Sequence, residues 1–234
     1  MFFYFDWTYF ILVLPAVILA VWASARVKST YRRFGGVPSA RGISGAQAAR
    51  MVLDENGLYD VKIEQIGGEL TDHFDPKANV VRLSADVYNS TSVAAIGIAC
   101  HEVGHAVQYA TGYFPIKIRS AILPLTNFGS KLAMPLLLIG LILSGIAEQY
   151  IAIAYLGVLC FALSAVFQLV TLPTEFNASA RAMRAVRSSL LLSDEEQRGT
   201  RKVLTAAALT YVAALAVSLA QVLRLLLIVN RRRN

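Results

Sequence analysis

The chain has 234 residues, of which 56% are hydrophobic, and a net charge of +7. Together with a mean hydropathy of +0.54, this composition excludes an ordinary soluble protein and indicates that a bilayer is part of the solvent. Cys100 and Cys160 are too few for a secreted disulfide framework. The basic residues gather where apolar runs end, so membrane topology explains the charge better than nucleic-acid binding does.

Four apolar stretches are candidate membrane spans, each needing roughly 20 residues. They are Trp7 to Ser24, Leu132 to Ala147 with a backward extension through residues 121–130, Ile151 to Leu172, and Val203 to Leu223 continuing to Val229. We interpret the first as a retained anchor, because it lacks the basic front end and cleavage site of a signal peptide. Pro124 and Pro135 predict kinks in the second, and residues 147–150 predict a tight turn before the third.

Residues 26–119 carry nearly all the turn and strand signals and predict a polar domain. Ser44 is typical of the N-cap of a short helix that ends at Asn56-Gly57. Alternation around Gly67-Gly68 in residues 61–74 predicts a hairpin, and residues 78–84 predict a further strand. Residues 90–112 predict one buried helix, capped by Ser90 or Thr91 and ended by Gly112.

The basic residues after the first span predict the orientation of the chain. Arg26, Lys28, Arg32 and Arg33 follow that span, so the positive-inside rule puts the polar domain in the cytoplasm. Four full crossings would place the terminal residues 231–233, all arginine, outside, against the same rule. Either the early charges override the late ones, or the last apolar segment does not cross simply.

The stretch CHEVGHAVQ, residues 100–108, contains two of the three histidines of the chain. In a helix, residues four apart lie on one face, so His101 and His105 offer their imidazoles to one point. Two imidazoles suit zinc, and Glu102, too far round the helix to be a ligand, is placed to take a proton from the attacking water. The pattern therefore predicts amide hydrolysis. The plainer alternative is a helical histidine pair without a metal.

A catalytic zinc needs a third protein ligand. Glu175 is our candidate, because it follows the third span at the start of a predicted new helix, on the same side of the membrane as the histidines. Its alternative is a carboxylate that merely complements a helix N-terminus. His73 is a second candidate ligand, whereas residues 194–196 are typical of the acidic first turn of a helix capped by Ser193.

Three segments carry a family resemblance: residues 72–108, which include HEVGH, residues 123–136 (LPLTNFGSKLAMPL) and residues 172–182 (LPTEFNASARA). The chain resembles the YugP-type membrane zinc metallopeptidases, distantly similar to the HtpX and CAAX-prenyl-protease gluzincins. The resemblance implies His101, His105 and Glu175 as ligands of one Zn²⁺ per chain, with Glu102 as general base. Ser179 and Asn177 stand where such patterns have aspartates, and a neutral partner would make a ligand histidine less basic.

The resemblance also implies that residues 79–84 form an edge strand that pairs with an extended substrate, the contacts being Asn79, Val80, Val81, Arg82 and Leu83. The alternative is a strand that only packs the helix. His73 is a candidate donor to the oxyanion of the scissile carbonyl, although Tyr88, Tyr109 and Arg184 are not distinguished from it by spacing.

The expected fold is α+β and mostly helical: a multi-pass plasma-membrane protein with a zincin-like cytoplasmic domain, made of the HExxH helix and a small β-sheet. The expected segments are an anchor (1–25), the zincin-like domain (26–120), a transmembrane hairpin (121–173), a helix with the third ligand (174–202) and a C-terminal transmembrane or membrane-associated helix (203–234). We expect a zinc metallopeptidase acting on a peptide or membrane-associated polypeptide, with the lipid bilayer as its other partner, no nucleic acid and no predicted oligomeric state. One alternative is a catalytically inactive zinc-binding scaffold or assembly factor. An ion transporter is disfavoured, because the spans hold almost no ionisable groups.

Overall fold

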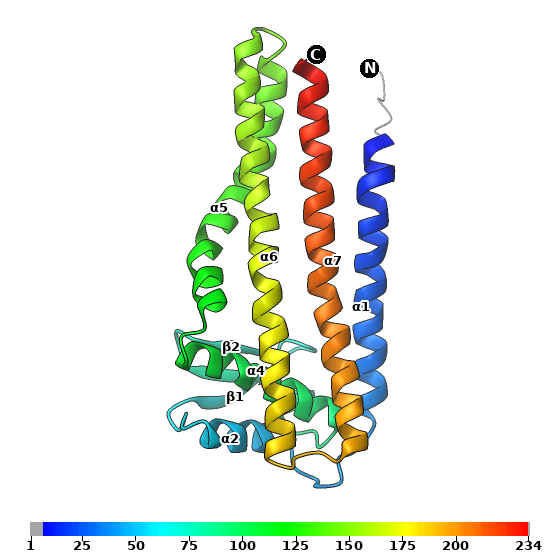
Figure 1. The fold of residues 1–234 in the computed structure, drawn as a ribbon, viewed down its shortest axis with the longest axis vertical. Coiled ribbons are helices and arrows are strands. Elements are labelled where there is room, and N and C mark those ends of the chain that lie inside the picture. The colour runs from blue at the N-terminus through cyan, green and yellow to red at the C-terminus, as the bar shows by residue number, and fades with distance from the viewer. Residues whose placement is uncertain (1–6, 234) are drawn as a thin grey trace. The chain divides into compact units, whose positions relative to one another are not determined.

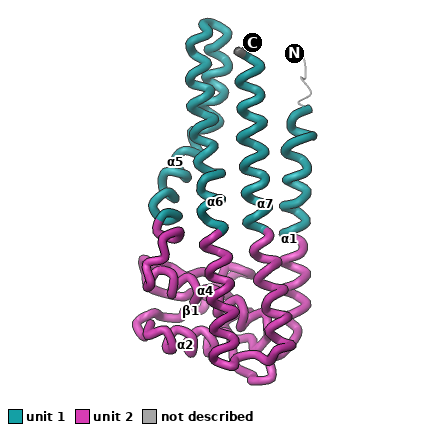
Figure 2. The backbone as a smooth tube through the Cα atoms, in the orientation of Figure 1, with its two compact units in different colours: residues 1–23, 118–172, 210–234 teal, residues 24–117, 173–209 magenta. Residues whose placement is uncertain are grey.

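The computed structural model describes residues 7–233, without the side chain of Arg233, and divides into two compact units (Figure 2). Unit 1 consists of residues 7–23, Ile118–Leu172 and 210–233. Unit 2 consists of Ser24–Lys117 and Pro173–Leu209. Residues 1–6 of the predicted anchor lie outside the described part of the chain.

Four described helices are long and apolar enough to cross a membrane, at the four places predicted from the sequence (Figure 1). A π-helix, Tyr9–Val13, leads into α1 (Leu14–Gly35), and the others are α5 (Phe114–Leu143), α6 (Ile151–Ser188) and α7 (Asp194–Arg233). The predicted turn between the second and third is a 3₁₀ turn, Glu148–Tyr150. Pro124 and Pro135 both lie inside α5, which bends along its length in Figure 1.

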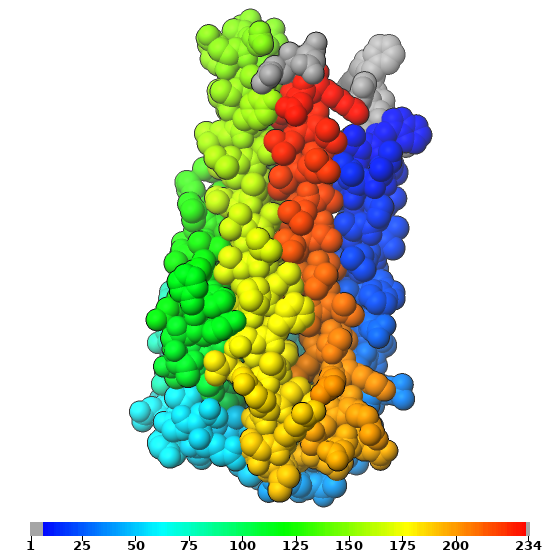
Figure 3. All heavy atoms as spheres, in the orientation of Figure 1, coloured from blue at the N-terminus to red at the C-terminus, as the bar shows by residue number. Residues whose placement is uncertain are grey.

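In unit 1, small residues bring α5 and α6 close together. A methyl group on Gly157 would lie 2.6 Å from the backbone nitrogen of Leu137, and one on Gly140 would lie 2.1 Å from that of Ala154. Small residues at such contacts are typical of helices packed within lipid. Large apolar side chains of these helices, such as Ile142 and Leu159, are exposed, and Figure 3 shows α6 and α7 uncovered along this face. A lipid-facing surface has this character.

Unit 2 contains the polar domain, and its first helix forms as predicted. Helix α2 (Gly45–Glu55) begins with a capping box, in which the Ser44 hydroxyl accepts from the Gln47 N–H and the Gln47 side chain accepts from the Ser44 N–H. It ends at Asn56, and Gly57 follows with φ +72°. A glycine tolerates this left-handed conformation without steric cost.

The sheet corrects two predictions. Its strands are β1 (Lys62–Ile66), β2 (His73–Asp75) and β3 (Val80–Ser84), in the spatial order β1-β3-β2. The predicted hairpin is wrong, because β1 and β2 do not pair with each other: β1 runs parallel and β2 antiparallel to β3.

The predicted edge strand is also wrong, because β3 is central and bonded on both sides. Residues Val80, Val81 and Leu83 are almost fully buried, as in a strand covered on both faces. The unpaired edges of the sheet belong to β1 and β2. The substrate-pairing role inferred for Asn79, Val80, Val81, Arg82 and Leu83 therefore loses its geometric basis.

Helix α4 (Val93–Ala110) forms the centre of the unit 2 core and packs against α2, against the sheet and against the short helix α3 (Ala85–Tyr88). Its N-cap is Ser92, whose hydroxyl accepts from the Ala95 N–H, rather than the predicted Ser90 or Thr91. Gly112, predicted to end this helix, follows it with φ +63°.

Helix α6 corrects a further prediction, because no new helix begins at Glu175. The helix continues through Pro173 to Ser188. Helix α7 begins as predicted, with three acids in its first turn and reciprocal bonds between Ser193 and Glu196.

Candidate metal centre

Two imidazoles of α4 lie together at the candidate metal centre. His101 and His105 are four residues apart, so the helix brings them to one face. Their ring centroids are 4.8 Å apart and the ring planes meet at 88°. His105 is buried and His101 nearly so. The close approach predicted from the sequence spacing is therefore present.

Glu175 joins the two histidines from α6, within the same unit. Its Oε2 lies 3.3 Å from Nε2 of His101 and 3.4 Å from Nε2 of His105, and the residue is 3% exposed. Ligand atoms of all three residues lie within 4.8 Å of one another, as a metal site requires. In a tetrahedral site with bonds of about 2.0–2.1 Å, neighbouring ligand atoms are about 3.3–3.4 Å apart, so this donor set fits zinc.

The outer nitrogen of each imidazole bonds to a neutral side chain. Nδ1 of His105 lies 3.0 Å from Oε1 of Gln108, and Nδ1 of His101 lies 3.1 Å from the Ser179 hydroxyl. Ser179 occupies this place as the sequence pattern implies, because it is one turn of α6 after Glu175. Sequence reasoning missed Gln108, although its position three residues after His105 in the same helix could have indicated it.

The orientation of the Gln108 amide is determined by its surroundings. Its Nε2 donates to the Thr174 carbonyl at 2.7 Å and to Oδ1 of Asn177 at 3.0 Å. A carbonyl only accepts, so the amide oxygen must face His105 and accept the Nδ1–H of that ring. Arg181 in turn donates from Nε to the same Asn177 oxygen at 2.8 Å. Four side chains thus form a hydrogen-bonded row from His105 to Arg181.

These contacts determine which nitrogen of His105 faces Glu175. With Nδ1 donating to Gln108, Nε2 faces Glu175 and offers a lone pair when the ring is neutral and a proton when the ring is charged. Burial tends to lower the pKa of His105, but the hydrogen bond to Glu175 and the charges of Glu102 and Glu175 outweigh it, and the net pKa is raised. The site therefore favours a cation between His105 and Glu175.

Glu102 is also buried, at 8% exposure, and its charge acts on His105. It lies about 100° around α4 from His101, so the two side chains leave neighbouring sides of the helix. His73, the candidate oxyanion donor, lies at the start of β2 with an exposed side chain, and its Nδ1 bonds to the Thr71 carbonyl. It is not among the three residues that converge.

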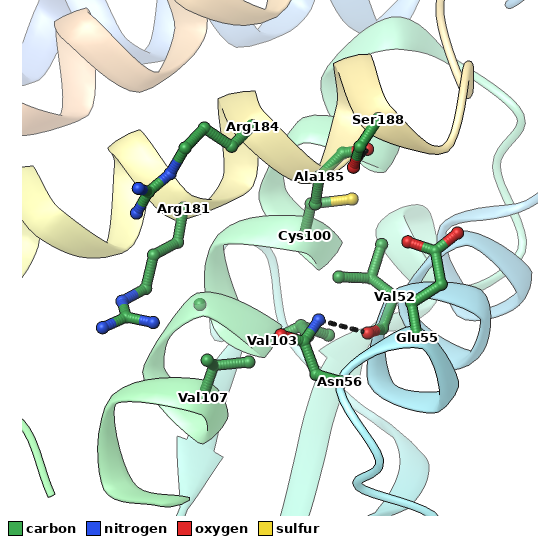
Figure 4. A pocket seen from close by; sticks show the side chains of 11 residues that line it. Val52, Glu55, Asn56, Cys100, Val103, Val107, Arg181, Arg184, Ala185 and Ser188 are labelled. Atoms are coloured by element: carbon green, nitrogen blue, oxygen red, sulfur yellow. Dashed lines mark hydrogen bonds between the residues drawn. The ribbon is translucent and has the colours of Figure 1, made fainter. Parts of the chain in front are cut away.

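A cavity of ≈ 260 Å³ lies on another face of α4 (Figure 4). From α4 it is lined by Cys100, Val103, Gly104 and Val107, and Val103 is two residues, or about 200°, around the helix from His101. Burial raises the pKa of the Cys100 thiol to about 12. The metal-centre residues do not line this cavity.

The comparisons with known proteins identify the family of the chain. The sequence profile of the family described as "Putative neutral zinc metallopeptidase" matches residues 9–230. The chain belongs to this zinc metallopeptidase family. It is also 45% identical over 223 residues to "Putative membrane protease YugP" of Bacillus subtilis (strain 168), an alignment covering 95% of this chain and 97% of that protein. No solved structure matches the chain.

Proposed function

We propose that this membrane zinc metallopeptidase hydrolyses peptide bonds with Glu102 as general base, and that His101, His105 and Glu175 hold one zinc ion per chain. The observation that carries the proposal is the convergence of Nε2 of His101, Nε2 of His105 and Oε2 of Glu175, because ligand atoms of the three residues lie within 4.8 Å of one another. Two imidazole nitrogens and one carboxylate oxygen are the protein donors of a catalytic zinc site, which keeps its fourth position open. The proposed substrate is a peptide or membrane-associated polypeptide, and the proposed location of hydrolysis is the cytoplasmic side of the plasma membrane.

Zinc bound there would supply Lewis acidity, lowering the pKa of a water molecule towards about 7 and polarising the scissile carbonyl. The protein's own groups do the remaining work. A carboxylate oxygen accepts a proton, so Glu102 would take one from the attacking water and then pass it to the leaving amine. Gln108 and Ser179 hold the imidazoles in the orientation that points both Nε2 atoms at Glu175.

The test separates metal binding from proton transfer. Purified full-length chain should hold about one zinc by elemental analysis. Glu102→Gln should retain that zinc and cleave fluorescein-labelled casein roughly 10²–10⁴-fold more slowly, because general-base catalysis contributes about this factor. Glu175→Ala should lose zinc, whereas Glu148→Ala, which removes an exposed carboxylate in the 3₁₀ turn, should not.

Two results would contradict the assignments. Glu175→Ala that holds zinc as tightly as the unaltered chain rules out Glu175 as a ligand. Equal casein cleavage by the Glu102→Gln variant rules out Glu102 as the base. An inactive scaffold predicts that Glu102→Gln changes nothing at all.

A further inference from the structure

A basic groove lies between α1 and α7 in unit 2, apart from the metal centre. Its volume is ≈ 650 Å³, and four cations line it: Arg26 and Arg33 from α1, and Arg201 and Lys202 from α7. Hydroxyl side chains from both helices add further hydrogen-bonding groups, and the described residues that line the groove include no carboxylate. The two helices run side by side here (Figures 1 and 3).

The groove lies where the apolar parts of both helices end. Arg26 is the first charged residue after the apolar run of α1, and Lys202 is the last one before the apolar run of α7. If these runs cross a bilayer, both cations stand at the depth of the lipid phosphates. Arg26 and Arg33 are seven residues apart, so they lie two turns apart on one face of α1.

The nearby acids of α7 bond to other partners. Glu195 pairs with Arg198 at 3.1 Å, and Glu196 accepts from the backbone N–H groups of Ala40 and Ser193. Among the described residues, neither Arg201 nor Lys202 forms an ion pair. Cations gathered without a carboxylate between them repel one another, and an anion in the groove relieves that repulsion.

An apolar groove of ≈ 170 Å³ adjoins the basic one and distinguishes a lipid from a free phosphate. Arg201 and Thr205 line both grooves, and the apolar groove continues along Leu204 and Ala208 of α7 and along Phe176 of α6. Leu204 and Ala208 lie further into the apolar run of α7 than Arg201 does. A molecule with its phosphate at Arg201 could therefore lay a hydrocarbon chain along these side chains.

We propose that the basic groove between α1 and α7 binds the phosphate headgroup of an anionic membrane phospholipid, with one acyl chain in the adjoining apolar groove. Two features identify this ligand. The cations lie where the apolar runs of the helices end, and the apolar groove begins at Arg201, which also lines the basic groove. A soluble phosphate would use only the first of these features.

The experiment measures lipid binding to the full-length chain in a non-ionic detergent by native mass spectrometry. Dioleoylphosphatidylglycerol should bind more tightly than dioleoylphosphatidylcholine, which has the same chains and no net charge. Arg201→Gln/Lys202→Gln should weaken the phosphatidylglycerol complex about 30-fold at low ionic strength, given the usual contribution of two basic side chains at an anionic surface. Both residues are exposed, so the substitutions leave the core intact.

Matched controls make the outcome specific. Lys62→Gln/Lys77→Gln removes the same charge from exposed positions of the polar domain and should leave binding unchanged. Arg201→Lys keeps the charge and should keep the complex. Equal binding of the two lipids, full binding by the groove variant, or an equal loss in the control would each overturn the proposal.

A last arm distinguishes the two sources of phosphate. Glycerol 1-phosphate, which lacks acyl chains, should not displace the lipid at an equal concentration. Complete displacement would show that the groove recognises a soluble phosphate and would overturn the lipid assignment. None of these measurements involves zinc or cleavage, so their failure leaves the proposed peptidase function untouched.

Discussion

At the scale of single residues, the orientation of the His105 ring depends on Gln108. Gln108 is completely buried. Its amide nitrogen donates to Thr174 and Asn177, so its amide oxygen accepts from His105. We therefore predict that Gln108→Met weakens zinc binding about 10–100-fold, because the ring loses the partner that holds its Nδ1 proton. The measurement is competition for zinc with a chelator of known affinity.

Asn177→Asp is the matched variant for that prediction. The new carboxylate still accepts from Gln108 and Arg181, so zinc affinity should stay the same or rise. A general loss of packing in Gln108→Met would lower the thermal stability of the zinc-free protein without a selective loss of zinc affinity. Unchanged zinc affinity in Gln108→Met would show that the Gln108 contact does not orient the ring.

The candidate site shows what local sequence patterns predict at this scale. The spacing of His101, Glu102 and His105 determines their arrangement, because helical periodicity relates them directly. Glu175 is 74 residues from His101, so its approach depends on tertiary packing and was predicted from chemistry and family resemblance. Gln108 was missed because a glutamine near a helix end is usually solvated, and only the packing of α6 buries it.

At the scale of elements, Gly104 allows α4 and α6 to approach closely. A Cβ at this position would lie 2.7 Å from the Ala178 carbonyl oxygen, which is backbone and cannot rotate away. Gly104→Ala should therefore push α6 from α4 and move Glu175 away from the histidines. We predict a destabilisation of about 1–3 kcal/mol, typical of overpacking, together with weaker zinc binding.

Gly35→Ala is the control for this prediction. It is also a helical glycine, in α1, but a Cβ there would meet nothing within 4 Å. Alanine favours a helix over glycine by up to about 1 kcal/mol, so the melting temperature of Gly35→Ala should be unchanged or slightly higher than that of the unaltered chain. A Gly104→Ala protein with the melting temperature and zinc affinity of the unaltered chain would contradict the close-packing argument.

The elements also show where sequence patterns are insufficient. Capping signals near Ser44 and Ser193 predict helix starts correctly, because the bonds they describe are local. The hairpin around Gly67-Gly68 is wrong because the partner of each flanking strand is β3, which follows both in the chain. Alternation predicts strands but not which strands pair. The prediction that residues 79–84 form an edge strand is wrong for the same reason.

At the scale of the whole molecule, apolar length is the most predictable property. Each of the four stretches found in the sequence is a helix, because a run of about 20 apolar residues in lipid must satisfy its backbone internally. The side of the membrane on which each loop lies is a separate question. It depends on the basic residues at the ends of the spans, which the positive-inside rule interprets.

That rule predicts opposite sides for the polar domain and for the turn between α5 and α6. Lys77→Cys should react with a membrane-impermeant maleimide only after cell lysis, whereas Gln149→Cys should react in intact cells. Both positions are exposed. The native thiols interfere little, because burial raises the pKa of Cys100 to about 12 and Cys160 lies within the apolar part of α6. Labelling of Lys77→Cys in intact cells would place the polar domain and the proposed metal centre outside, where a peptidase would meet extracellular rather than cytoplasmic polypeptides.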